Sequence, residues 1–330
     1  MIQSKIAFLT EMGFMGKVPA NHPNMRTEFA WMHALDADHF NIHMLDELKG
    51  YEHVFIIFPK GKPFLNSTAV ELVKGINPIS ELLQQNIVDT IKEKGNKNVH
   101  YVQEGPHWFQ TDYSVEDQIY FYNFVASCDS IFTHNDSDVY YYKGLFPNKK
   151  VRPIGTLMID TLIKDIVPTK EDKAIIGGNF ARWYGGFESY MIADNFGVPI
   201  WAQTSHATRE NEDMGGSLNH LPRMMWGEWM QHLSTFKYAV HMMPTVAAGT
   251  FALNCAYFGI PCIGNQDVDT QSLCHPSLSV AVNDLEAARK LAIQLRDDKD
   301  FYNECSEMAK ANYEACFSKE LWLRNIKREL

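Results

Sequence analysis

The feature that most constrains this chain is the alternation of short apolar runs with segments of helical periodicity along its whole length. In the first half, the apolar runs are residues 6–9, 54–58, 99–102, 130–133 and 151–154. In the second half, they are residues 174–176, 199–202, 238–242, 261–263 and 279–282. Alternation of this kind predicts parallel sheets covered by helices on both faces. The chain is therefore expected to be an α/β protein.

The length of 330 residues favours two domains. Residues 160–172 carry proline and charges without a clear strand, so we place the linker there. The predicted domains are residues 1–165 and 166–317, followed by a closing helix at 318–330. Each domain is expected to hold its ligands at the carboxyl ends of its strands.

The composition narrows the class of protein and its partners. Hydrophobic residues make up 45% of the chain and charged residues 21%, as in a soluble globular protein. The formal net charge of −10 argues against a general polyanion binder, although a local basic patch can still hold a phosphate backbone. The six cysteines form no CxxC pair, which favours free thiols in a reducing compartment. With no apolar segment long enough to span a bilayer and a start that reads as a first strand, we expect a cytoplasmic protein.

Two glycine turns in the second half indicate a site for an anion. The first reads Gly177-Gly178-Asn179-Phe180-Ala181-Arg182, and the second reads Ala247-Ala248-Gly249-Thr250 before a helical run. Glycines let backbone N–H groups approach an anion, a helix start adds partial positive charge, and an arginine clamps phosphate oxygens. The predicted diphosphate ligands are Arg182 and the backbone N–H groups of Gly178, Asn179, Gly249 and Thr250. A surface salt bridge is the alternative for Arg182.

Two further side chains are candidates for the same site. His241 ends the apolar run before the second turn, where it can contact ribose or phosphate, and a buried core histidine is the alternative. Asp269, after Gly264-Asn265, can bind sugar hydroxyls, although ordinary loop polarity explains it equally well. The acidic and histidine residues lack metal-ligand spacing. We therefore expect binding by backbone and arginine without a divalent metal or a tightly bound cofactor.

The run from Gly249 to Gly264, with Gly259-Ile260-Pro261 inside it, resembles the donor-binding helix and following strand of the GT-B nucleotide-sugar glycosyltransferases. The resemblance implies two facing Rossmann-like domains with parallel sheets and a cleft between them. It also implies that residues 166–317 bind a UDP-sugar and that the closing helix 318–330 returns to the first domain. Many members carry a glutamate in the donor-binding helix for sugar or ribose hydroxyls. This chain has Asn254 there, so the paired glutamates of retaining members are missing.

A narrower resemblance is to the DNA β-glucosyltransferases of T-even bacteriophages. It rests on Gly177-Gly178-Asn179-Phe180-Ala181-Arg182 with Glu188-Ser189 behind it, and on the strand end at residues 101–109. The resemblance implies a hydroxymethylated pyrimidine in DNA as the acceptor. It also implies that a phage-encoded protein would act in the host cytoplasm.

Sugar transfer needs a base for the acceptor hydroxyl, and Glu104 is the leading candidate. It follows a buried strand, and Gly105-Pro106 turns the chain there, which places a carboxylate at the carboxyl edge of the sheet. A solvated loop glutamate is the alternative. Glu28 is a second candidate carboxylate, and Arg26 can steady the acceptor or the donor. Asp38-His39 is predicted to be polar surface at a helix end.

These features together predict a GT-B glycosyltransferase that acts by direct displacement with inversion. A glycan or small molecule is the alternative to DNA as the acceptor. A sugar-nucleotide epimerase of similar fold and a non-catalytic two-domain binding protein are the other classes. The basic residues of Lys149-Lys150-Val151-Arg152 and of the closing helix can form a stripe for a DNA backbone, and a solvated helix face is the alternative.

Overall fold

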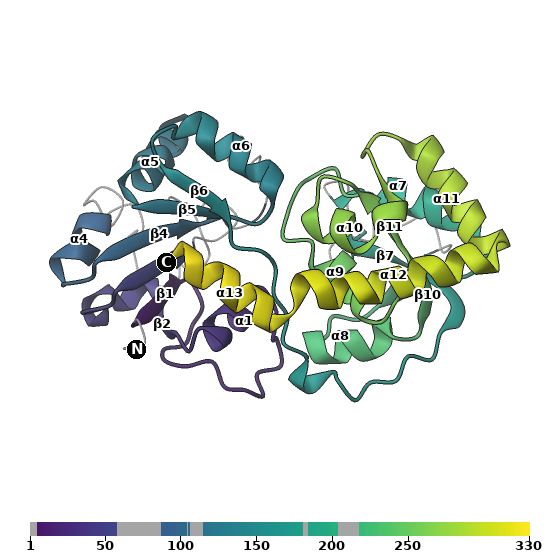
Figure 1. The fold of residues 1–330 in the computed structure, drawn as a ribbon, viewed down its shortest axis with the longest axis horizontal. Helices are drawn as coiled ribbons and strands as arrows, with labels where there is room; N and C mark the ends of the chain where they lie inside the picture. The colour runs from purple at the N-terminus through teal and green to yellow at the C-terminus, as the bar shows by residue number, and fades with distance from the viewer. Residues whose placement is uncertain (1–4, 58–86, 104, 106–114, 181–183, 204–217) are drawn as a thin grey trace. The chain divides into compact units, whose positions relative to one another are not determined.

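The computed structural model describes residues 5–57, 87–103, 105, 115–180, 184–203 and 218–330 (Figure 1). As far as it is described, the chain divides into two compact units. Unit 1 comprises Met1–Ala20, Glu28–Gly155 and Leu323–Leu330, and unit 2 comprises Asn21–Thr27 and Thr156–Trp322. These units are defined by contacts, so the bounds of independently folding domains at 1–165 and 166–317 stay a prediction.

In the described part of unit 1, six parallel strands form one sheet in the order β2-β1-β3-β4-β5-β6. The strands are β1 (Ile6–Thr10), β2 (Asp38–Asn41), β3 (His53–Ile57), β4 (Asn98–Val102), β5 (Ser130–Thr133) and β6 (Lys150–Pro153). The helices are α1 (Thr27–Ala34), α4 (Ile87–Glu93), α5 (Val115–Ser127) and α6 (Asp136–Leu145), with a 3₁₀ segment at Ile42–Glu47. α13 (Lys319–Glu329) contributes its last turns to this unit.

The sheet of unit 1 is apolar on both faces, as expected for a parallel sheet covered by helices. On one face, Val54, Val99 and Ile131 pack with residues of α4, α5 and α6 in a continuous buried core. On the other face, aromatic rings follow one another across the strands. The centroids of Phe8 and Phe55 are 4.9 Å apart, and those of Phe55 and Phe132 are 5.4 Å apart.

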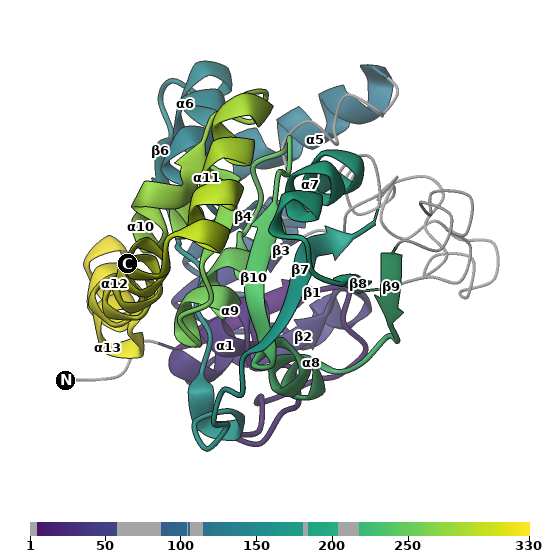
Figure 2. The ribbon, with the colours of Figure 1, turned by 90° about the vertical axis from the view of Figure 1, so that its right-hand side faces the viewer.

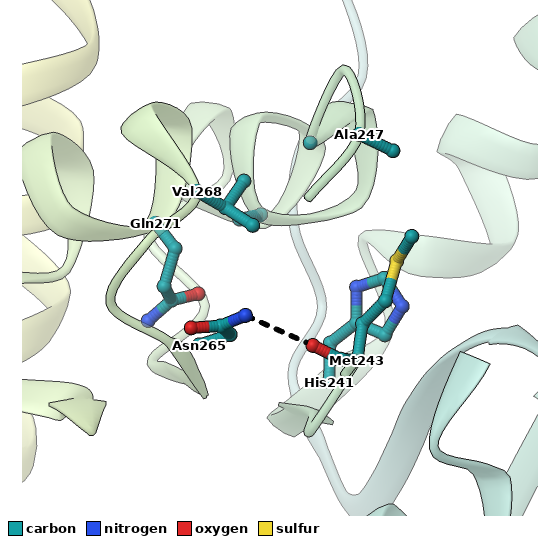
Figure 3. A pocket seen from close by; sticks show the side chains of 8 residues that line it. His241, Met243, Ala247, Asn265, Val268 and Gln271 are labelled. Carbon is teal, nitrogen blue, oxygen red and sulfur yellow. Dashed lines mark hydrogen bonds between the residues drawn. The ribbon is translucent and has the colours of Figure 1, made fainter. Parts of the chain in front are cut away.

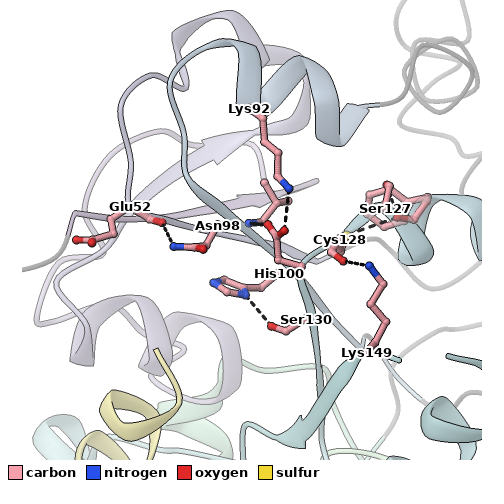
Figure 4. A network of polar contacts seen from close by, with 11 residues as sticks. Glu52, Lys92, Asn98, His100, Ser127, Cys128, Ser130 and Lys149 are labelled. Carbon is pink, nitrogen blue, oxygen red and sulfur yellow. Dashed lines mark hydrogen bonds and ion pairs between the residues drawn. The ribbon is translucent and has the colours of Figure 1, made fainter. Parts of the chain in front are cut away.

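Three buried histidines of unit 1 form hydrogen bonds to side chains of neighbouring strands. His100 Nδ1 lies 2.7 Å from Ser130 Oγ, and His100 Nε2 lies 3.0 Å from His53 Nδ1 (Figure 4). His39, in β2, lies 2.8 Å from Thr10 Oγ1 and is fully buried. The prediction that Asp38-His39 is polar surface at a helix end is therefore wrong for His39. The reason is a hydroxyl partner from β1, which the local sequence does not reveal.

In the described part of unit 2, a second six-stranded parallel sheet has the order β12-β11-β10-β7-β8-β9. The strands are β7 (Glu171–Asn179), β8 (Ile200–Gln203), β9 (Leu218–Leu221), β10 (Phe236–His241), β11 (Cys262–Asn265) and β12 (Ser279–Val280). The helices are α7 (Gly186–Ala193), α8 (Trp226–Leu233), α9 (Thr250–Tyr257), α10 (Asp269–Cys274), α11 (Leu285–Asp297) and α12 (Lys299–Phe317). Short 3₁₀ segments lie at Asp160–Leu162, Asp194–Phe196 and Pro276–Leu278.

Helices pack against the sheet of unit 2 and against one another. α7 contacts β7 and β10, and α11 packs against α7. α9 contacts β7 and β10 from the other side, with α10 and α12 packed against it (Figure 2). The predicted α/β class with two Rossmann-like parallel sheets is confirmed. No described helix is long and apolar enough to cross a membrane.

Candidate functional site

The strand order of unit 2 defines where a ligand is expected. From β7 the chain moves outward through β8 and β9, and β10 then returns to the opposite side of β7. In open parallel sheets, ligands bind outside the carboxyl ends of the strands at the point where the order reverses. In unit 2 this point lies between β7 and β10. The first predicted glycine turn begins in the last residues of β7, and the second lies between β10 and α9.

At this point Gly177 and His241 are in direct contact. The register pairs Val240 with Ile176, so the next residues, His241 and Gly177, lie side by side. A methyl group on Gly177 would lie 2.7 Å from Cδ2 and 2.8 Å from Cβ of His241. Gly177 therefore leaves the space that the imidazole occupies. On its other side, the His241 ring meets Phe251 edge to face, with centroids 5.2 Å apart.

The turn after β7 brings the start of α7 against the segment that leaves β10. Gly178 has φ of +69°, a left-handed conformation that favours glycine, and Tyr184 packs against it. Ser189 Oγ, on α7, accepts a hydrogen bond of 2.9 Å from the backbone N–H of Met242. These contacts fix the segment between β10 and α9 from the β7 side.

The second turn positions the N-terminus of α9. Gly249 is the N-cap residue with φ of +67°, and its carbonyl accepts a hydrogen bond of 2.7 Å from Thr270 Oγ1. A side chain on Gly249 would overlap Thr270 and would lie 2.6 Å from Cγ1 of Val268. The first N–H groups of a helix have no partner within the helix and carry partial positive charge. The N-terminus of α9 is therefore a site where an anion can bind.

A small hollow lies at this edge of the sheet (Figure 3). Its lining residues come from β10, the turn before α9, α9, β11 and α10: His241, Met243, Ala247, Gly249, Ala252, Asn265, Val268 and Gln271. Asn265 Nδ2 donates a hydrogen bond of 3.0 Å to the Met243 carbonyl, as Figure 3 shows. Gln271 Nε2 donates one of 2.8 Å to the Cys262 carbonyl. The two amides thus hold the wall of the hollow rigidly.

Two polar atoms of the segment from β10 to α9 have no hydrogen-bond partner among the described residues. They are Nε2 of His241 and Oγ1 of Thr245, and both atoms are buried. Thr245 is only 8% exposed. Burial lowers the pKa of His241 to about 4, so the imidazole is neutral at pH 7. Buried polar groups are normally paired, so these two atoms, beside the N-terminus of α9, are candidates for pairing with a ligand.

The structure brings several predicted site residues together and leaves others outside the described residues. Gly178, His241, Gly249 and Thr250 lie at the carboxyl ends of β7 and β10 or at the start of α9. Asn179 is the last residue of β7, and only its backbone is described. Arg182 and Glu104 fall outside the described residues.

Asn254 and Asp269 differ in their surroundings. Asn254 lies inside α9, is 1% exposed, and accepts a hydrogen bond of 3.4 Å at Oδ1 from Trp226 Nε1. Asp269 is the first residue of α10, whose next residue, Thr270, bonds to Gly249. Donor binding by either residue stays a prediction.

The two catalytic candidates near the first glycine turn belong to different units. Arg26 lies in unit 2, where its backbone pairs with Met158 and its Nε donates a hydrogen bond of 3.0 Å to Asn24 Oδ1. Glu28 lies in the first turn of α1, in unit 1. A role in catalysis stays a prediction for both.

Sequence reasoning missed Thr245, Asn265 and Gln271 as parts of this site. Thr245 gives no signal beyond its place between a strand and a glycine turn. For Gln271 the only trace in the sequence is Gly264. A side chain on Gly264 would lie 2.7 Å from Gln271 Oε1, so the glycine leaves room for the glutamine. Among the residues described, no group of three His, Cys, Asp or Glu side chains could hold a metal ion. Metal independence itself stays a prediction.

Solved structures of low sequence identity share this fold over nearly the whole chain. An α-glucosyltransferase in complex with UDP-glucose and DNA containing an abasic site has a TM-score of 0.65 at 11% identity, covering 99% of both chains. Sucrose-phosphate synthase from Thermosynechococcus elongatus has a TM-score of 0.61 at 12% identity, covering 98% of both chains. These likenesses show that the chain has the GT-B fold.

A longer neighbour shares the fold over part of its length. The pneumococcal O-GlcNAc transferase GtfA, in complex with UDP and GlcNAc, has a TM-score of 0.59 at 12% identity, and the match covers 87% of this chain and 58% of that one. No protein-family model matches this sequence, and no curated protein matches it. The likeness is therefore one of fold.

Proposed function

We propose that this protein is a glycosyltransferase that takes a sugar from UDP-sugar and transfers it to a hydroxyl group. The observation that carries the proposal is the N-terminus of α9, which begins at Gly249. The preceding segment holds two buried polar atoms, of His241 and Thr245, that have no partner in the part of the chain that the structure describes. This arrangement suits a diphosphate, because helix N–H groups and side-chain donors stabilise its oxygens as the sugar leaves. The solved neighbours that carry UDP or UDP-glucose support the choice of nucleotide.

The proposed acceptor is a hydroxymethylated pyrimidine in DNA. One support is an α-glucosyltransferase solved with UDP and a 13-mer DNA containing a HMU base, which matches 99% of this chain with a TM-score of 0.63. The other is the sequence resemblance to DNA glucosyltransferases. The enzyme is expected to act without a divalent metal, because backbone and side-chain donors neutralise the diphosphate.

Glu104 is the proposed base, because in the sequence it stands two residues after the end of β4. In direct displacement the base takes the proton of the acceptor hydroxyl as the oxygen attacks the anomeric carbon, and UDP leaves with inversion. Glu104→Gln should lose transfer and keep its affinity for UDP-glucose. Unchanged turnover would remove Glu104 from the mechanism.

The test is transfer of radiolabelled glucose from UDP-glucose to DNA duplexes. One duplex contains a hydroxymethylated pyrimidine, and a matched duplex contains the unmodified base. Label on the first duplex alone supports the proposal. If neither duplex is labelled and a glycan is, the acceptor is a glycan instead of DNA. Interconversion of the UDP-sugar without an acceptor would favour an epimerase. NMR of the product decides between inversion and retention, because an α-linked product from UDP-glucose means retention.

A further inference from the structure

A purely structural role does not explain the unpaired ring nitrogen Nε2 of His241. It is the last residue of β10, its ring rests on Gly177, and its Nε2 is buried without a partner among the described residues. It also lines the hollow that Gly249 closes at the start of α9 (Figure 3). The buried His39 and His275 also leave Nδ1 unpaired, but each pairs its other ring nitrogen, as His275 pairs Nε2 with the Ala252 carbonyl at 3.1 Å. His241 makes no side-chain hydrogen bond among the described residues.

The surroundings of His241 hold its imidazole neutral in the protein alone. The groups that face it in the described part of the chain are Gly177 of β7 and Phe251 of α9, and the hollow is lined further by Asn265 of β11 and Gln271 of α10. None of these side chains ionises. The connection from β11 to α10 carries two carboxylates, Asp267 and Asp269. The low pKa of His241 is caused by burial of the ring and not by a neighbouring charge.

A diphosphate in this hollow would favour the protonated form of the His241 imidazole over the neutral form. Its oxygens carry full negative charge beside a buried nitrogen, and an opposite charge within a few ångströms favours the charged form of a titratable group. The ring then carries a proton on both nitrogens and donates a charge-assisted hydrogen bond to a phosphate oxygen. The proton comes from the solvent.

We propose that His241 binds the donor diphosphate as an imidazolium, so that each donor molecule brings one proton into the site. This inference rests on the proposed function, because it requires a nucleoside diphosphate sugar in the hollow. Its consequence is a donor affinity that falls as pH rises. One proton taken up per ligand corresponds to a loss of up to about tenfold in affinity per pH unit, in the range where the free histidine is neutral and the bound one is charged.

The test is calorimetric titration of UDP-glucose at pH 6 in two buffers of different ionisation enthalpy. The difference between the two heats gives the number of protons taken up. UDP-glucose is the probe because the terminal phosphate of UDP itself titrates near pH 6, whereas the diphosphate of UDP-glucose has no such group. The wild type should take up close to one proton per donor, and His241→Gln should take up none and bind more weakly.

His275→Gln is the matched control, because His275 is also buried with a pKa lowered to about 4 but does not line the hollow. It should keep the uptake of one proton. Wild-type binding without uptake, or full uptake in His241→Gln, would overturn the inference and leave the proposed function standing. Absence of binding by UDP-glucose and by a panel of GDP-, ADP- and CMP-sugars would overturn both.

A second measurement covers the case in which His241→Gln does not fold. In ¹⁵N-histidine spectra of the wild type at pH 6, one buried imidazole should change from a neutral tautomer to the imidazolium when UDP-glucose is added. A spectrum in which all buried imidazoles stay neutral with the donor bound would refute the proposal.

Discussion

A single methyl group at Gly177 tests whether the end of β7 is shaped around His241. In Gly177→Ala the new carbon would lie 2.7 Å from Cδ2 and 2.8 Å from Cβ of His241, well inside van der Waals contact. The neighbour on the far side of the ring is Phe251. The imidazole must therefore shift against packed atoms, and overpacking of this kind costs about 1–3 kcal/mol. We expect urea unfolding to show that loss in the free energy of unfolding.

Gly227→Ala is the matched control, because Gly227 lies in α8 with no atom within 4 Å of an added methyl group. It should stabilise the protein by about 0.5–1 kcal/mol through helix propensity. A double-mutant cycle with His241→Ala measures how much of the lost stability comes from contact between the new methyl group and the His241 ring. Without the ring, Gly177→Ala should cost much less free energy of unfolding. A Gly177→Ala protein as stable as the wild type, or an equal penalty with and without the His241 ring, would refute this reasoning.

Three further predictions concern the rest of the molecule. Burial lowers the pKa of His100 to about 3, so below the unfolded value of about 6.5 the unfolded chain binds a proton that the folded chain refuses. The free energy of unfolding should therefore fall as the pH is lowered from about 6.5 towards about 3. In urea titrations, His100→Gln should reduce the slope of this fall by up to about 1.4 kcal/mol per pH unit. An unchanged slope would contradict a buried neutral His100. Asn254→Ala removes the acceptor of Trp226 Nε1 and should cost about 1–3 kcal/mol of stability. If Asn254 instead binds the donor, affinity for UDP-glucose will fall with little loss of stability. Transfer should persist in EDTA, and its abolition with recovery on adding Mg²⁺ would refute metal-independent binding.

The sequence predicts most of the framework because buried parallel strands are readable as apolar runs. The runs at 6–9 and 99–102 lie within β1 and β4. β2 (Asp38–Asn41) is not recognisable as an apolar run because three of its four residues are polar, and the buried His39 bonds to Thr10 of the neighbouring strand. β9 (Leu218–Leu221) escapes for the same reason, since its two central residues, Asn219 and His220, are exposed.

Of the candidate site, the sequence predicts the glycine turns but not the side-chain contacts around them. Gly178 and Gly249 stand out in the sequence because left-handed turns before helices favour glycine, and both have positive φ. The sequence does not reveal that Gly177 fits against His241, or that Thr270 ties Gly249 to the start of α10. Those contacts join residues far apart in the chain, and the strand order that brings them together is a property of the whole sheet.

The most direct test of a donor site at the start of α9 is the affinity of UDP-glucose for Gly249→Ala, measured by calorimetry beside Gly197→Ala. Both glycines have φ near +68°, so both variants share the backbone strain, but only Gly249 lines the hollow. A methyl group at Gly197 would meet no atom within 4 Å, whereas one at Gly249 would displace Thr270 and Val268. The account predicts wild-type affinity in Gly197→Ala and a loss of at least about tenfold, or about 1.4 kcal/mol, in a folded Gly249→Ala protein. Equal affinity in the two variants would contradict a donor site at this helix.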